Sequence, residues 1–190
     1  MCSSDLPVAE WIHYTSFLVQ ERLDPYRLGP LARLRLRLRH QVMRRDEQRL
    51  KASMRGDALP PAPMVDIAHI VAHAAPYISA HLTGEAVLTV GSALAEIVDQ
   101  VCGVIAIGPF GCMPNRLSEA LLTEAMTRPG KLAAAADPAR YARLGEIDDL
   151  PFLAIESDGA PFPQLIDAKL ETFCLRARRL HDLIHQHDPG

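Results

Sequence analysis

A turn rich in glycine and proline, from Gly108 to Pro114, joins an apolar run to a helical pattern and constrains the fold more than any other segment of this chain. The run before the turn, residues 101–107, predicts a fully buried β-strand. The residues after it have helical spacing, with Pro114 at the first helical position, where proline is favoured. The segment therefore predicts a strand, a tight turn and a helix in direct succession.

The same succession occurs again nearer the C-terminus. Residues 151–156 predict a second strand, residues 157–159 predict a turn, and Pro163 begins the last helix. Helical patterns at residues 64–79 and 84–99 precede the first unit. The residues that the last helix is expected to bury recur every three or four positions and are Leu165, Ile166, Leu170, Phe173, Ala177, Leu180 and Ile184. Two strand–turn–helix units in succession predict a parallel sheet with right-handed crossovers.

The predicted fold class is α/β, with a Rossmann-like (flavodoxin-like) parallel sheet and its helices in the C-terminal half and a mainly helical region before it. We assign residues 7–63 to the helical region and its linker, and residues 64–190 to the α/β domain. Pro30 is expected to begin a long helix. Arg and Leu alternate with a strand-like period of two at residues 33–39, but helix is favoured because both are good helix formers.

Composition excludes several classes of protein. The 190 residues are 48% hydrophobic with a net charge of -3, which is typical of a globular protein and gives no overall attraction to nucleic acid. Charged or polar residues interrupt each apolar stretch before it reaches membrane-spanning length, and no secretory signal is visible. The cysteines at positions 2, 102, 112 and 174 form no CxxC pair and no disulfide spacing, so we expect a cytoplasmic location.

Residues 1–6 form a segment that we interpret separately. After Met1, the residues Cys2 to Leu6 can be encoded by a DNA string that matches the end of a widely used sequencing adapter. We expect these residues to be a sequencing artefact and the natural gene to extend upstream, so that the chain is the C-terminal fragment of a longer protein. The alternative is an ordinary short start.

The helix expected from Pro30 to Gly56 has a strongly basic face. Its basic residues are Arg33, Arg37, Arg44, Arg45, Lys51 and Arg55. Phosphates of a nucleic acid or of CoA are one kind of ligand for such a face, but no aromatic residues are interleaved to stack bases. We favour a solvated face, or one that docks on an acidic domain.

Cys112 is the candidate site residue of this chain. It lies on a strand-to-helix turn, close to the first backbone N–H groups of a helix, where the local field favours thiolate over thiol. A thiolate there is a metal ligand or a nucleophile, and the alternative is a buried cysteine that fills space. In an open parallel sheet, ligands bind where strands end and helices begin, and both Cys112 and Asp158 are predicted to lie at that edge.

Several segments match one family in order and spacing. They are Gly84 to Gly91, Gly103-Val104-Ile105, the turn from Gly108 to Pro114, Pro151-Phe152-Leu153, Asp158-Gly159 and Leu170 to Phe173. Together they resemble the 2-hydroxyacyl-CoA dehydratase family (2-hydroxyglutaryl-CoA dehydratase component-like), and specifically its long proteins described as CoA-substrate-specific enzyme activase-related. The resemblance covers roughly residues 70–180. The turn with its cysteine is the specific element, whereas the flanking strands and helices are generic.

The resemblance implies a Rossmann-like domain of a dehydratase-type component that carries a [4Fe–4S] cluster, with Cys112 as one ligand. A separate ATP-hydrolysing activator, or an upstream ATPase-like domain, would pass one electron to the cluster. The reduced cluster would then permit elimination of water from a 2-hydroxyacyl-CoA in anaerobic metabolism. One cysteine cannot hold a cubane cluster, so the other ligands would lie outside this chain and the isolated fragment would be inactive. Cys102 and Cys174 depart from the family pattern, and we interpret both as core packing.

Five histidines lie close enough together in the sequence to be considered as metal ligands. His69 and His73 lie four positions apart on a predicted helix, a spacing that can hold a metal from one face. Two partly exposed histidines beside a core stripe are the commoner case, and we favour it. His181, His185 and His187 lie near the end of the last helix, where we expect a solvated surface.

Two acidic residues have ordinary structural explanations. Glu85 is expected to cap a helix, and Asp158 to form an Asp-Gly turn.

Two other functions are alternatives to the iron–sulfur protein. In one alternative, the chain is a non-catalytic docking or regulatory module with a structural Cys112. In the other, Cys112 is the nucleophile of an enzyme, which needs a base that the sequence does not place nearby. No GxGxxG or Walker loop occurs, so any nucleotide site would be upstream.

Overall fold

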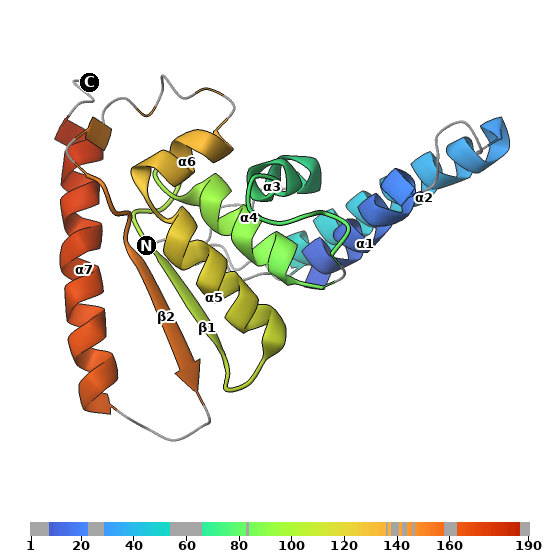
Figure 1. The fold of residues 1–190 in the computed structure, drawn as a ribbon. Helices are drawn as coiled ribbons and strands as arrows, with labels where there is room; N and C mark the ends of the chain where they lie inside the picture. Colours follow the sequence, from blue (N-terminus) through green and yellow to red (C-terminus); the bar gives the residue numbers. More distant parts are fainter. Residues whose placement is uncertain are drawn as a thin grey trace. The chain divides into compact units, whose positions relative to one another are not determined.

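The structure is a computed structural model, and it describes residues 8–22, 29–53, 66–82, 84–135, 137, 141, 144–145, 147–157 and 163–186. The chain divides into two compact units, one formed by Leu6–Ala68 and the other mainly by His69–Gly190. The described part is mixed α/β and mostly helical, with one small parallel sheet (Figure 1). This confirms the predicted α/β class and the presence of a parallel sheet. Among the described helices, none combines the length and the apolarity that crossing a membrane requires.

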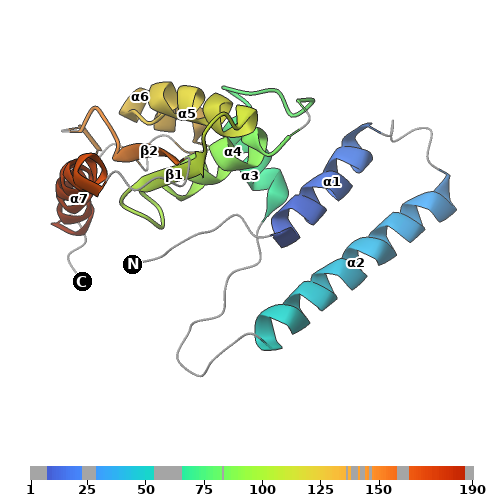
Figure 2. The same cartoon turned by 90° about the horizontal axis from the view of Figure 1, so that it is seen from below.

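The first unit contains a pair of helices, α1 (Val8–Arg22) and α2 (Pro30–Ser53). The prediction of a helix rather than a strand after Pro30 is confirmed. The two helices run antiparallel (Figure 2), because His13 contacts Glu47 while Ser16, one turn later, contacts Met43. The His13 Nε2 atom lies 2.8 Å from the Glu47 Oε2 atom, and both side chains are buried. The two buried groups can reach each other in only one register of α1 against α2, so this contact fixes the alignment of the two helices.

The sheet of the second unit consists, among the described residues, of β1 (Val104–Pro109) and β2 (Phe152–Ser157). The strands pair in parallel from Val104 opposite Phe152 to Pro109 opposite Ser157, which confirms the predicted parallel pairing. The first strand begins later than predicted. Gly103 lies so close to the ring of Phe173 that a Cβ atom there would collide with it, so Gly103 serves packing against α7 rather than pairing with β2.

The prediction that the first strand is fully buried is wrong. Ala106 and Gly108 are buried, but Ile107 is 68% exposed and Ile105 is also exposed. Successive side chains of a strand point to opposite faces of the sheet. The described residues cover one face of β1, and the two isoleucines lie on the other face.

The helix α4 (Ala86–Glu96) is the centre of the second unit. Nearly all of its residues are buried, and it packs against α5 (Met113–Ala125) and α6 (Arg128–Ala134). Gly91 lets it approach the Ile70 carbonyl of α3 (Ile67–Ala74), because a side chain at that position would have no space. Glu85 occupies the N-cap position, as expected, but its side chain makes no capping hydrogen bond.

The last helix, α7 (Pro163–Gln186), begins at the predicted proline and packs against β2. Two predictions about its side chains are wrong. Leu165 is 63% exposed, although Leu180 is fully buried as expected. Cys174 is exposed and does not pack in the core. It follows Phe173, which faces Gly103, and the next residue along a helix is turned by about 100°, so its side chain points elsewhere.

Candidate functional site

The turn between β1 and α5 places Cys112 as the sequence predicts. The Cys112 backbone N–H donates a hydrogen bond of 3.1 Å to the carbonyl oxygen of Pro109, which closes the turn. Gly111 has a φ of 78°, a left-handed conformation that glycine adopts without steric cost. Cys112 is the N-cap residue of α5, and Pro114 is at the second helical position rather than the first. The thiol therefore belongs to the residue from which the helix starts.

The Cys112 side chain is neither fully buried nor used as a helix cap. It makes no capping hydrogen bond to the helix, and the residue is partly exposed. Its neighbours Phe110 and Met113 are both largely exposed. Capping side chains normally bond the free N–H groups of the first turn, so a cap residue that makes no such bond leaves its polar atom for another partner. The interpretation of Cys112 as a fully buried space-filling residue does not describe this turn.

Polar residues from two elements lie at the same edge of the sheet. The Arg116 Nη1 atom, on α5, lies 3.0 Å from Glu156 Oε2 at the end of β2 and 3.1 Å from Glu119 Oε2. The Asn115 side chain occupies the space that a Cβ atom of Gly108 would need. Arg116 and Glu156 could not be predicted from the sequence, because no local pattern links two residues that are 40 positions apart. Asp158, the other residue predicted at this edge, lies outside the described residues.

The donor atoms of the described chain can supply one ligand of an iron–sulfur cluster, but not a complete set. Cys102 precedes β1, whereas Cys112 follows it, and Cys174 lies on α7. Burial raises the pKa of the Cys102 thiol, which disfavours the thiolate that binds metal. In the part of the chain that the structure describes, no group of three or more His, Cys, Asp or Glu residues could hold a metal ion. A cluster on Cys112 would therefore need ligands from elsewhere.

The histidine pairs are close together but do not form a complete metal site. The rings of His69 and His73 are 4.2 Å apart, and those of His181 and His185 are 4.3 Å apart. His73 is buried, and its Nδ1 atom donates a hydrogen bond of 2.9 Å to the His69 carbonyl oxygen. A structural zinc site takes four ligands, and neither pair has a third donor among the residues described. His187 lies outside the described residues.

His73 makes the stability of the protein depend on pH. Burial lowers its pKa below the ordinary value of 6.5, and the charges of His69 and Lys131 act in the same direction. The folded state therefore holds this proton less tightly than the unfolded chain. We expect the free energy of unfolding to be highest above pH 6.5 and to fall as the pH decreases through the folded pKa. Urea denaturation at about pH 7.5 and about pH 5.5 measures the decrease, which should be smaller in His73→Gln. Equal decreases in both proteins would contradict the assignment.

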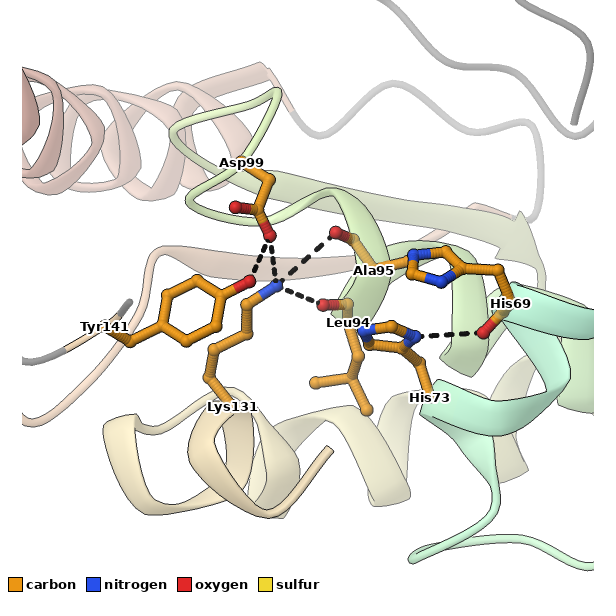
Figure 3. A network of polar contacts seen from close by, with 7 residues as sticks. All are labelled: His69, His73, Leu94, Ala95, Asp99, Lys131 and Tyr141. Carbon is orange, nitrogen blue, oxygen red and sulfur yellow. Dashed lines mark hydrogen bonds and ion pairs between the residues drawn. The ribbon is translucent and has the colours of Figure 1, made fainter. Parts of the chain in front are cut away.

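A network around a buried lysine lies at the C-terminal end of α4 (Figure 3). The Lys131 Nζ atom donates to the carbonyl oxygens of Leu94 at 2.6 Å and Ala95 at 3.4 Å, and lies 3.0 Å from Asp99 Oδ2. The Tyr141 hydroxyl donates to the same carboxylate oxygen at 2.5 Å. Lys131 is 0% exposed, so its ammonium group is out of reach of a substrate. It satisfies carbonyl groups at the end of α4 and ties α6 to that helix.

Comparisons with protein-family models, curated proteins and solved structures found no match to this chain. The likeness to the dehydratase family therefore rests on the residues named above.

Proposed function

We propose that this chain is part of a dehydratase- or activase-type iron–sulfur protein acting on 2-hydroxyacyl-CoA, in which Cys112 is one ligand of a [4Fe–4S] cluster. The observation that carries the proposal is the position of the Cys112 thiol: partly exposed, without a capping hydrogen bond, at the edge where parallel strands end. Ligands of open α/β sheets bind at this edge. A cluster bound there would supply one-electron chemistry for the dehydration.

The chain's own residues would have distinct parts in that site. Cys112 would provide one thiolate ligand, and the other ligands would come from an upstream segment or a separate subunit. Arg116 already lies between two carboxylates, Glu119 and Glu156, so its charge is offset locally and it fixes the end of β2 against α5. Because Asn115 fills the space above Gly108, the backbone of the turn is held close to the first turn of the helix.

The same proposal includes a larger, Rossmann-like sheet. A purely parallel sheet is normally covered on both faces. Here the sheet has two strands in the described residues, and Ile105 and Ile107 project from a face of β1 that leaves them exposed. An additional strand beside β1 and a helix over its exposed face would bury these residues. A sheet that continues into an upstream domain or a second subunit would provide both the additional strand and the covering helix. The same polypeptide could then bring the missing cluster ligands.

Anaerobic iron and labile-sulfide analysis of the full-length protein tests the ligand role. We expect about four irons and four sulfides per chain in the parent protein, and loss of most of both in Cys112→Ala. Cys174→Ala is the matched control, because Cys174 is exposed on α7 and remote from the turn, and it should keep its iron. Unchanged iron in Cys112→Ala would refute the ligand role.

Alkylation of the thiols distinguishes this proposal from a docking module with a structural Cys112. In the cluster-free protein, Cys112 should react with iodoacetamide at neutral pH while the fold is intact. Cys102 should react more slowly, because burial raises its pKa. Protection of Cys112 until the protein unfolds would favour the structural role.

A further inference from the structure

The helix α2 has a second apolar face that α1 does not use. Its first face carries Leu36, His40, Met43 and Glu47, of which the last three contact α1. The other face carries Leu31, Leu34, Leu38 and Val42, whose side chains are between 52% and 82% exposed. We call these four residues the leucine seam. Spacings of three and four positions align them along one side of the helix.

The leucine seam is flanked by arginines. If Leu31 and Leu38 occupy the a positions and Leu34 the d position of a heptad, Val42 falls at an e position beside them. The remaining e and g positions include Arg35, Arg37, Arg44 and Arg49. All four arginines are exposed, and Arg49 lies 3.7 Å from Asp46 on the same helix. Overall, α2 contains eight basic and two acidic residues, although the whole chain has a net charge of -3. The e and g positions set partner choice in helix pairs through their charges.

We propose that the leucine seam docks an acidic amphipathic helix of another polypeptide, with apolar residues at its a and d positions and Glu or Asp at its e and g positions. This inference does not depend on the iron–sulfur proposal. A second copy of α2 does not suit the seam, because arginines would face arginines across the interface, and like charges there oppose pairing. No other described helix of this chain has more than three acidic residues, so a partner from outside suits the charge best.

A membrane surface or a nucleic acid suits α2 less well. Helices that lie in membrane interfaces have a broad apolar face with Trp or Phe, whereas α2 has no Phe, Trp or Tyr and its seam is narrow. A narrow apolar stripe, here from Leu31 to Val42, is the pattern of a helix pair. Nucleic acid would use the arginines alone and would leave the exposed leucines without a partner. The combination of the two residue types favours a protein helix.

Fluorescence anisotropy with designed peptides tests the proposal on the full chain. The acidic probe is a labelled helical peptide of the length of α2, with Leu at a and d and Glu at e and g. The basic probe has Lys in place of each Glu. We expect the acidic probe to bind about tenfold or more tightly than the basic probe, and to bind more weakly as salt increases from about 50 to about 300 mM. Failure of the acidic probe to bind, or equal binding of the two probes, would overturn the proposal.

Variants assign the binding to the leucine seam. Leu34→Ala with Leu38→Ala should weaken binding of the acidic probe about tenfold or more, and should leave the helical circular dichroism unchanged, because both residues are exposed and alanine favours helix. Leu175→Ala, an exposed leucine on α7, is the matched control and should have no effect. Undiminished binding by the double variant would refute the assignment. Binding to phosphatidylserine vesicles or to DNA but not to the acidic probe would also refute it, as would a dimer that the double variant dissociates.

Discussion

Replacement of Lys131 by Met is expected to destabilise the second unit by about 3 kcal/mol. Removing one partner of a buried ion pair leaves the other charge in a poorly solvated place, and this costs about 3–5 kcal/mol. The Asp99 side chain is 16% exposed, so water reduces the penalty and the lower end of that range applies. The substitution also removes the donor that the Leu94 carbonyl uses at the end of α4.

Urea unfolding of the full chain, followed by circular dichroism, measures the effect of Lys131→Met. Lys169→Met provides the matched control, because Lys169 is an exposed lysine on α7. We expect its free energy of unfolding to stay within about 0.5 kcal/mol of the parent value, as is usual for surface substitutions. If Lys131→Met were as mild as Lys169→Met, the lysine network would not hold α4 and α6 together.

Replacement of Gly91 by Ala is expected to destabilise the same unit by about 2 kcal/mol, although a helix interior intrinsically favours alanine over glycine. Alanine gains about 1 kcal/mol over glycine in a helix interior. At Gly91, however, a Cβ atom would collide with the backbone carbonyl of Ile70 and with its Cγ2 atom. Backbone atoms can move only if α3 and α4 separate, and overpacking of this kind costs about 1–3 kcal/mol or more.

The sign of the change distinguishes the two contributions to the Gly91 result. Thermal or urea unfolding of Gly91→Ala should show a loss, whereas Gly145→Ala should show none. Gly145 is exposed, and the nearest atom to its added Cβ would be Arg128 Nη1 at an ordinary distance of 3.7 Å. A gain of stability in Gly91→Ala would mean that the two helices are not in close contact.

The sequence predicted those elements best that have a local start signal. Proline marks the starts of α2 and α7, and both helices begin at the predicted residues. The helix expected at residues 64–79 is shorter, at Ile67–Ala74, because Pro76 cannot continue it. The burial of β1 was predicted wrongly, since an apolar run indicates a strand but not which of its faces another element covers.

The candidate site was predictable only where its residues are close in the sequence. The position of Cys112 follows from consecutive residues of one turn, and the structure has the cysteine at the start of α5. The pairs Arg116–Glu156 and Lys131–Asp99 join residues from separate elements, so their contacts depend on how the helices pack. No local pattern encodes such contacts. The cluster ligands beyond Cys112 stay a prediction for the same reason.

The parallel register of the sheet has a consequence for the order of folding. Val104 pairs with Phe152, about 48 residues along the chain, so the pairing closes a long loop before it gains any contact. The contacts of α4, α5 and α6 with one another join segments that are nearer in sequence. We therefore expect helical packing around α4 to come first and the pairing of β2 with β1 to come last. Until it does, both edges of β1 are open to pairing with another chain, and the Gly108–Pro114 turn limits how far such a strand could extend.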